Sequence, residues 1–182
     1  GQDVFDLLTE AHSTIGELMS INPSEEYDIN DLVMDTISSI KNKETKLVKT
    51  GYKKIDSFSG GLTRGEITII GGRPGHGKTT FLVNLVSKMR SEGHRCMLFN
   101  RELPNSEVIK KLICLESRNL SYSMVRKGIF AEHDLKELEI VKHQLCKKYN
   151  ADDFKMFDHI KNFAKTASEV KKFKPDVVFD DY

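Results

Sequence analysis

Short apolar runs alternate with longer amphipathic stretches from Glu66 to the end of the chain. Apolar runs of this length indicate buried strands, and apolar residues spaced by three and four indicate helices. The expected strands are 66–70, 96–99, 154–158 and 176–181; the expected helices are about 81–91, 105–117, 132–149 and a short one from 166. This alternation implies an α/β fold in which a parallel sheet carries helices on both faces. Such sheets bind ligands beyond the carboxyl ends of their strands.

The first part of the chain has a different pattern, which indicates two helices. A narrow apolar stripe repeats at spacings of four and three over residues 2–19: Val4, Leu8, Ala11, Ile15 and Leu18. A second helix is expected over 29–40, with Leu32, Ile37 and Ile40 as its main apolar positions. Residues 41–50 have the polar, basic composition of a linker. We therefore expect a helical linker segment over 1–45 and an α/β domain over 46–182. The apolar stripe needs a partner surface, from a neighbouring subunit or from the same chain.

Local signals mark the ends of three helices in the α/β part. Gly93 follows the helix that ends near Ser91, at the place of a C-terminal glycine. Asn105 or Ser106 is expected to cap the next helix. Thr166-Ala167-Ser168-Glu169 has the pattern of a capping box that opens the last helix.

A glycine-rich sequence lies between the first expected strand and the first expected helix of this part. It fits G-x-x-x-x-G-K-[ST], the pattern of the phosphate-binding loop of nucleoside triphosphatases, and reads Gly72-Arg73-Pro74-Gly75-His76-Gly77-Lys78-Thr79. Glycines let backbone N–H groups curl around phosphates, and the helix N-terminus adds a favourable dipole. Lys78 would reach the β- and γ-phosphates, and the Thr79 hydroxyl would hold Mg²⁺. A chance match in a turn is the alternative, and the flanking strand and helix patterns argue against it.

Two carboxylates that follow strand ends complete a candidate catalytic set. Glu102 comes three residues after the strand 96–99, where a carboxylate could orient the water that attacks a γ-phosphate. A solvated glutamate near a helix N-terminus is the alternative interpretation. Asp180 or Asp181 ends the last strand, at the usual position of a carboxylate that supports Mg²⁺. Alone this signal is weak, because many buried strands end in aspartate.

Composition narrows the class of protein. The 182 residues are 38% hydrophobic and 30% charged, and no apolar run approaches the roughly 20 residues of a membrane span. Three separated cysteines indicate neither a zinc site nor a disulfide framework. The net charge of +1 gives no overall signature of nucleic-acid binding. The lysine pairs 110–111, 147–148 and 171–172 are expected on solvated helix faces.

The residues around the phosphate loop carry a family resemblance. Four stretches resemble the beginning of the RecA-like ATPase domain of DnaB-type replicative helicases. They are Thr50-Gly51-Tyr52-Lys53-Lys54-Ile55-Asp56, Gly60-Gly61-Leu62-Thr63-Arg64-Gly65-Glu66, Gly72-Arg73-Pro74 and Gly77-Lys78-Thr79-Thr80. Asn100-Arg101-Glu102-Leu103-Pro104 resembles the next motif of that family, whose glutamate is the catalytic base. Phe179-Asp180-Asp181-Tyr182 resembles its metal-side motif, which usually reads apolar-Asp-Tyr and therefore selects Asp181 over Asp180. The family commonly has Ser-Met at Gly75-His76, where mainly the backbone contributes.

This resemblance implies a RecA-like P-loop NTPase that hydrolyses ATP with Mg²⁺ during 5′→3′ unwinding of DNA. The implied ATP-binding residues are Gly72, Arg73, Pro74, Gly75, His76, Gly77, Lys78, Thr79 and Thr80. Lys78 and Glu102 would be catalytic, and Thr79 and Asp181 would hold the metal. Family members form hexameric rings, bind single-stranded DNA, and pack the helix that resembles 2–19 against the neighbouring subunit. We expect a homo-oligomer without membrane contact, in the bacterial cytoplasm or as a phage protein in a bacterial host.

Parts of the family's machinery are not expected in this sequence. The loops that grip single-stranded DNA, and the arginine finger that reaches the next subunit's γ-phosphate, follow the metal-side motif in the family. The domain that binds primase precedes the linker helix. We expect a C-terminally truncated helicase. Loss of such an arginine costs about 10³–10⁵ in rate in related phosphoryl transfer, so we expect nucleotide binding, poor hydrolysis and no unwinding.

Two alternatives stay open at this point. A KaiC- or RadA-like ATPase shares the Thr-Gly and Gly-Gly-Leu signals, although Arg73-Pro74 and the upstream helices favour the DnaB type. A catalytically silent module could keep the fold only for oligomerisation. Such a module would need neither Glu102 nor the intact Lys78-Thr79 pair.

Overall fold

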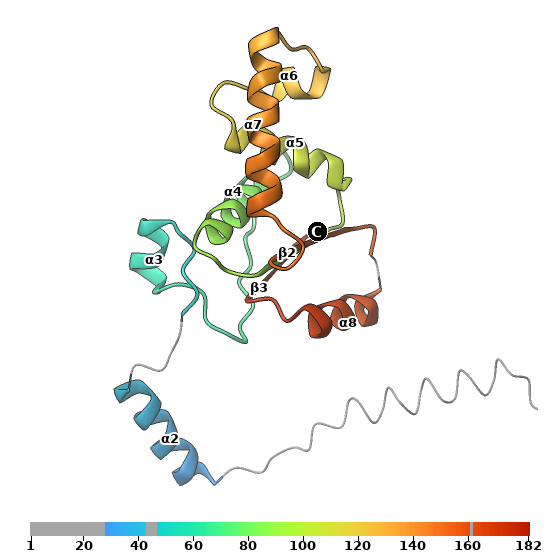
Figure 1. Ribbon diagram of the computed structural model, residues 1–182. Helices are drawn as coiled ribbons and strands as arrows, with labels where there is room; N and C mark the ends of the chain where they lie inside the picture. The colour runs from blue at the N-terminus through green and yellow to red at the C-terminus, as the bar shows by residue number, and fades with distance from the viewer. Residues whose placement is uncertain (1–27, 43–46, 161) are drawn as a thin grey trace, which may run out of the picture. The chain divides into compact units, whose positions relative to one another are not determined.

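The computed structural model describes residues 28–42, 47–160 and 162–182 (Figure 1). The chain divides into two units, residues 1–45 and 46–182, and each is described by itself. The helix expected over 2–19 lies outside the described residues.

The described part of the first unit is helix α2 (Ile29–Lys41), which confirms the helix expected over 29–40. Its N-terminus is capped by Asp28, whose carboxylate accepts a hydrogen bond from the Asn30 N–H at 2.7 Å. Lys41 lies in the last turn, where a positive charge complements the helix dipole. The apolar residues Leu32, Ile37 and Ile40 are exposed in the described structure.

The second unit is built on a parallel sheet whose three described strands run in the order β2-β1-β3. These are β1 (Cys96–Asn100), β2 (Phe154–Asp158) and β3 (Val177–Asp181). In the pairing register, Cys96 lies opposite Phe154 on one side and Val177 on the other. All five residues of β1 are buried, as expected for the central strand of a parallel sheet. Three of the four expected strands are therefore confirmed.

The strand expected over 66–70 is absent from the described structure, and that prediction was wrong. Residues 66–70 have no strand assignment and no sheet partner, although they lead directly into the phosphate loop. Ile67 and Ile69 are 89% and 86% exposed. An apolar run forms a strand only when a neighbouring strand pairs with its backbone, and none of the described strands does so.

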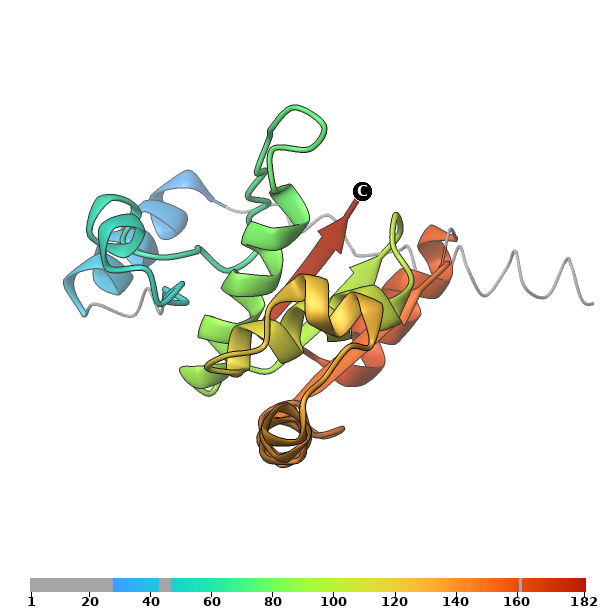
Figure 2. The ribbon, with the colours of Figure 1, turned by 90° about the horizontal axis from the view of Figure 1, so that it is seen from above.

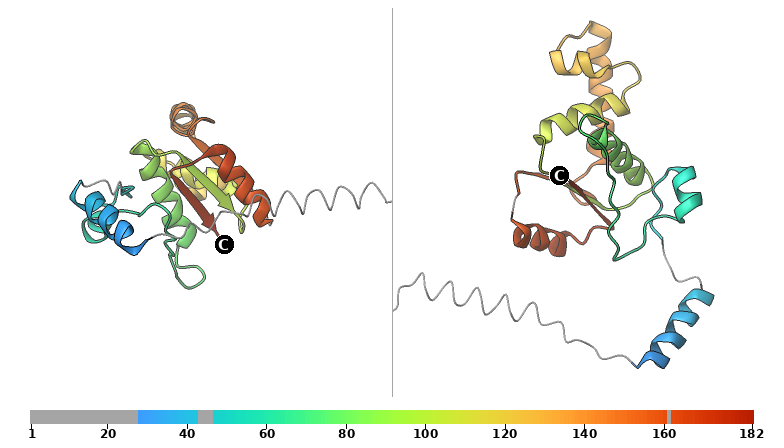
Figure 3. Two further views of the ribbon diagram at one scale, coloured as in Figure 1. Left: turned by 90° about the horizontal axis from the view of Figure 1, so that it is seen from below. Right: turned by 180° about the vertical axis from the view of Figure 1, so that it is seen from behind.

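Helices cover both faces of the sheet, and this confirms the α/β arrangement. On one face, Cys96 and Leu98 pack with residues of α4 (Lys78–Ser91) and α5 (Asn105–Glu116), and α7 (Glu132–Lys148) packs beside α5. On the other face, Met97 and Phe99 pack against Phe173 of α8 (Phe163–Phe173). Figures 2 and 3 show α4 and α8 on opposite sides of the strands. The alternation of side chains along β1 thus divides the core into two layers.

Two expected helix starts were wrong. The N-cap of α5 is Pro104, and the Asn105 N–H donates to the carboxylate of Asp158 at 3.1 Å. Helix α8 begins at Phe163, because the side chain of Asn162 accepts from the Lys165 N–H at 3.3 Å. Thr166 therefore lies inside the helix rather than at its cap. Two short helices, α3 (Lys53–Ser59) and α6 (Tyr122–Lys127), were not expected.

The residues that precede α3 belong to the domain and not to a linker. Val48 and Leu62 exchange two backbone hydrogen bonds, of 2.9 and 2.8 Å. The Asp56 carboxylate accepts from the N–H groups of Thr50 and Gly51 and from the Thr50 hydroxyl. Polar composition suggested a linker up to Thr50, but these bonds hold its last residues in place.

Candidate phosphate-binding site

The glycine-rich loop runs from Gly72 to Gly77 and enters α4 at Lys78. Gly75 and Gly77 have φ angles of 77° and 83°, in the left-handed region. Residues other than glycine rarely adopt this backbone conformation. The glycines of the sequence motif therefore lie where the shape of the loop requires them. The loop is exposed and lies at the same end of the sheet as the carboxyl end of β3 (Figure 2).

Backbone N–H groups of the loop and of the first turn of α4 form a potential anion site. In the described structure, the amides of Gly75, Gly77, Lys78, Thr79 and Thr80 have no hydrogen-bond acceptor. Gly77 provides no side-chain cap for the helix. Free N–H groups at a helix N-terminus attract anions, and their partial positive charge adds to that of the helix dipole. This arrangement fits a phosphate group.

Lys78 brings a positive charge to the loop. A side chain at Gly72 would meet the Lys78 Cγ at 3.3 Å, so the lysine stem passes close to this glycine. Lys78 is half-buried and has no carboxylate partner among the described residues. Its ammonium group therefore has no internal counter-charge and is available to a phosphate.

A hydrogen bond joins the phosphate loop to the end of β3. The Thr79 hydroxyl donates to Oδ2 of Asp181 at 2.8 Å, across 102 residues of sequence. Asp181 is 5% exposed, so its carboxylate is buried beside the first turn of α4. Because the hydroxyl donates its proton, its lone pairs stay free for a cation. A hydroxyl and a carboxylate oxygen side by side are the kind of ligands that Mg²⁺ takes.

The structure distinguishes the two neighbouring aspartates. Successive side chains of a strand point to opposite faces, so Asp180 and Asp181 lie on different sides of β3. Asp180 is exposed and accepts from Nε and Nη2 of Arg101 at 2.6 and 2.7 Å. Asp181, which the family motif selects, is the one beside the phosphate loop.

Glu102 lies in the turn between β1 and α5, beyond the carboxyl end of the strand next to β3. It is exposed and has no hydrogen-bond partner among the described residues. The Arg101 N–H donates to the Asp181 carbonyl at 3.0 Å, which ties this turn to the end of β3. The structure thus brings Glu102 and Asp181 to the same edge of the sheet. A role for Glu102 in catalysis stays a prediction.

The sequence placed Asn100 and Arg101 in a family motif but did not reveal that they hold this turn. Asn100 Nδ2 donates to the Leu103 carbonyl at 2.7 Å. Arg101 pairs with Asp180 through two bonds and donates through Nη1 to the Ile160 carbonyl at 2.5 Å. An arginine beside a candidate catalytic glutamate was the available signal, but its partners lie 79 and 59 residues away.

The helix that carries the loop is anchored to the rest of the domain. The Tyr52 ring stacks on Phe81, in the first turns of α4, with ring centroids 5.6 Å apart. Farther along α4, Ser87 donates to Glu116 at 2.7 Å, and Lys148 Nζ donates to both of these side chains. These contacts fix α4, and with it the phosphate loop, against α5 and α7.

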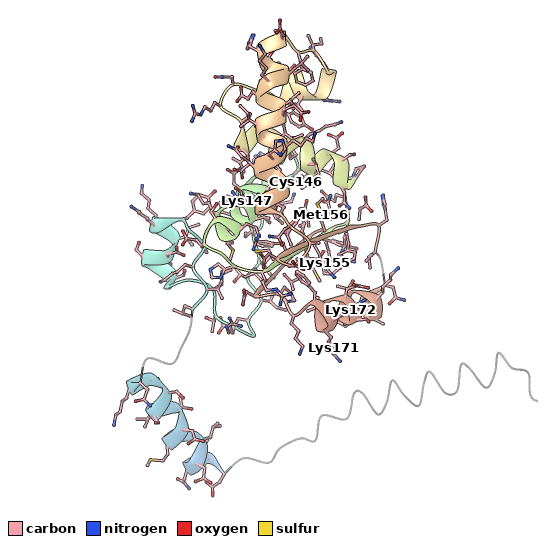
Figure 4. The ribbon with its side chains drawn as sticks, viewed as in Figure 1. Cys146, Lys147, Lys155, Met156, Lys171 and Lys172 are labelled. Carbon is pink, nitrogen blue, oxygen red and sulfur yellow. The ribbon has the colours of Figure 1, made fainter. Side chains whose placement is uncertain are left out.

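The expectation that all three lysine pairs are solvated was wrong for three of their members. Lys148 is half-buried in an ion pair of 2.6 Å with Glu116. Lys110 is half-buried beside Glu107, and Lys111 is half-buried over the Tyr122 ring. Lys147, Lys171 and Lys172 are exposed, and Figure 4 shows them on the outer surfaces of α7 and α8.

A parallel sheet with helices on both faces and a glycine-rich loop entering α4 define a RecA-like P-loop fold. A family model for the DnaB-like helicase C terminal domain matches residues 48–182, and the chain belongs to this family. Family membership sets aside the KaiC- or RadA-like alternative.

Curated relatives agree with the family model. Replicative DNA helicase DnaC of Bacillus subtilis is 27% identical over 139 residues, which cover 72% of this chain and 30% of the relative. Replicative DNA helicase DnaB of Buchnera aphidicola subsp. Schizaphis graminum is 26% identical over 160 residues, covering 82% and 34%. The chain therefore spans about a third of the length of these relatives.

Solved structures share the fold. A structure described as an ATPase domain superposes with a TM-score of 0.68 at 20% identity, covering 87% of this chain and 58% of that one. A DnaB-like replicative helicase, described with its interactions with primase, gives a TM-score of 0.66 at 20% identity, covering 94% and 43%. Among the described residues, no helix has the length and apolarity needed to cross a membrane.

Proposed function

We propose that this chain binds and hydrolyses ATP with Mg²⁺ as the ATPase part of a replicative DNA helicase that unwinds duplex DNA. The observation that carries the proposal is the hydrogen bond between Thr79 and Asp181. A P-loop enzyme needs its phosphate loop and its metal-side motif close together. This bond joins the two, although they are far apart in the sequence. Membership of the DnaB-like family supports the same interpretation.

In this proposal the loop and the start of α4 hold the phosphates. Residues Gly72–Thr80 line the site, with free N–H groups from Gly75, Gly77 and the first turn of α4. Lys78 neutralises charge on the β- and γ-phosphates, and Thr79 and Asp181 hold Mg²⁺. A Mg²⁺ ion held there would supply positive charge against the negative charge of the phosphates during transfer.

Glu102 is proposed to orient the attacking water and to accept its proton. Its exposed carboxylate is free of partners in the described structure, so it can contact a water molecule beside the γ-phosphate. Asn100 and Arg101 fix the turn on both sides of it. The turn is thereby held at the edge where Asp181 lies.

The wider partners are proposed from the family alone. We propose a homo-oligomeric, hexameric assembly that binds single-stranded DNA in the bacterial cytoplasm, either as a bacterial or as a phage protein. A catalytically silent scaffold would not explain the bond between Thr79 and Asp181.

Single-turnover hydrolysis tests the proposed chemistry. With protein in excess over labelled ATP, we expect slow, Mg²⁺-dependent conversion to ADP by the purified chain. Glu102→Gln should lower this rate by about 10²–10⁴-fold and leave ATP affinity intact. Glu92→Gln, an exposed glutamate at the far end of α4, is the matched control and should keep the rate. Equal rates for Glu102→Gln and the unaltered chain would refute the role of Glu102.

A further inference from the structure

Asn100 carries a buried polar atom that the proposed chemistry does not use. It is the last residue of β1 and is 2% exposed. Its Nδ2 donates to the Leu103 carbonyl at 2.7 Å, but its Oδ1 has no hydrogen-bond partner among the described residues. Buried polar atoms are nearly always paired, so an unpaired one calls for a partner such as a water or an ion.

The position of Asn100 indicates which partner that is. In the parallel pairing of β1 with β3, Asn100 lies opposite Asp181. Paired residues of neighbouring strands lie about 4.8 Å apart and direct their side chains to the same face. Asn100 and Asp181 therefore share the face of Leu98 and Phe179, against which α4 packs. Since Asp181 accepts from Thr79, the unpaired oxygen belongs to the same group of side chains as the proposed Mg²⁺ ligands.

We propose that Asn100 is a positioning residue of the Mg²⁺ site, whose Oδ1 accepts a hydrogen bond from a water of the hydrated ion. This inference rests on the proposed function of Thr79 and Asp181. The bond from Nδ2 to the Leu103 carbonyl fixes the orientation of the amide and leaves Oδ1 as the free end. A neutral amide oxygen suits the place, because a second carboxylate beside Asp181 would repel it whenever the cation is absent.

The same bond links the metal side to the turn that carries Glu102. The Nδ2 of Asn100 donates to the carbonyl of Leu103, the residue after Glu102, and its Oδ1 is free to accept from the hydrated ion. Groups that hydrogen-bond to the surroundings of a metal typically contribute about 10–100-fold to its affinity. Asn100 thus sets both the hydration of the ion and the position of the turn.

The test compares binding of a non-hydrolysable ATP analogue by calorimetry, in Mg²⁺ and in EDTA. Asn100→Leu, of similar size, should weaken Mg²⁺-dependent binding by about 10–100-fold and leave binding in EDTA unchanged. Asn105→Leu is the matched control, because Asn105 also has a buried Oδ1 without a described partner but lies beside Asp158 of β2. It should bind like the unaltered chain in both media.

Asn100→Asp keeps an oxygen at this place and removes the donor to Leu103. We expect it to bind Mg²⁺ with the nucleotide at least as tightly as the unaltered chain, even if Asn100→Leu fails to fold. If Asn100→Asp weakens Mg²⁺-dependent binding, the amide acts through Leu103 alone and the inference is overturned. Unchanged binding by Asn100→Leu, or an equal loss in Mg²⁺ and EDTA, also overturns it. If the unaltered chain binds no nucleotide, the proposed function fails and the inference with it.

Discussion

Replacing Thr79 by valine removes the hydroxyl that links the phosphate loop to β3. Valine has nearly the same shape and is also β-branched, so the helix itself is little affected. The hydroxyl donates to a buried carboxylate at 2.8 Å, and hydrogen bonds to charged groups contribute about 1.5–3 kcal/mol. In Thr79→Val the Asp181 carboxylate stays buried, and no described residue of α4 donates a hydrogen bond to it. We therefore expect Thr79→Val to lower the free energy of unfolding by about 1.5–3 kcal/mol.

The assay is urea unfolding of the chain without nucleotide or Mg²⁺, followed by circular dichroism. Thr80→Val is the control, because Thr80 is the next residue of α4 and is exposed. It should change the free energy of unfolding by less than about 0.5 kcal/mol. Thr79→Ser keeps the hydroxyl and should recover most of the loss. Equal losses for Thr79→Val and Thr80→Val would refute the inference that this bond stabilises the site.

Two further predictions concern contacts that hold the domain around the site. Arg101→Met removes both bonds to Asp180 and the bond to the Ile160 carbonyl, and it should cost about 1–2 kcal/mol of unfolding free energy. In the background of Asp180→Asn the same change should cost clearly less, and an equal cost would rule out a contribution from the Arg101–Asp180 pair. Burial raises the pKa of Asp56, but hydrogen bonds from Thr50 and Gly51 and the charge of Lys49 outweigh it and hold that pKa below its ordinary value of 3.8. The ionised Asp56 carboxylate therefore stabilises the fold fully well above pH 3.8, and this stabilisation is lost as the pH falls through the lowered pKa. Urea unfolding at about pH 7 should show a lower free energy of unfolding for Asp56→Ala than for the unaltered chain. This difference should shrink below pH 3.8.

Much of the sheet could be predicted because its strands are continuous apolar runs. The five residues of β1 are buried on both faces, and a run such as Cys96–Phe99 is what that environment selects. The run 66–70 is similarly apolar but has no described partner strand, and pairing depends on tertiary structure rather than on propensity. Composition alone does not distinguish the two cases.

Helix starts were predicted less well, because several residues compete to cap a helix. The capping-box pattern at Thr166 lies one turn inside α8, since Asn162 caps the helix first. Asn105 donates its N–H to Asp158, a residue 53 positions away. A local signal cannot reveal a partner at that distance.

The candidate site also combines features that the sequence predicts with features that only the structure shows. The phosphate loop could be found from its glycine spacing, because Gly75 and Gly77 adopt left-handed backbone conformations. Strand alternation separates Asp180 from Asp181, but the face that meets α4 is known only from the packing. The unpaired oxygen of Asn100 has no signal in the sequence at all.

Nucleotide binding tests the central claim most directly. Calorimetric titration of the purified chain with Mg²⁺ and a non-hydrolysable ATP analogue should give saturable binding at one site. Lys78→Ala should weaken it at least about tenfold, because a charge-assisted hydrogen bond to phosphate contributes about 1.5–3 kcal/mol. Lys54→Ala, an exposed lysine of α3, should bind like the unaltered chain. Absence of binding by the unaltered chain, or equal binding by Lys78→Ala, would contradict the account and leave the fold as a scaffold.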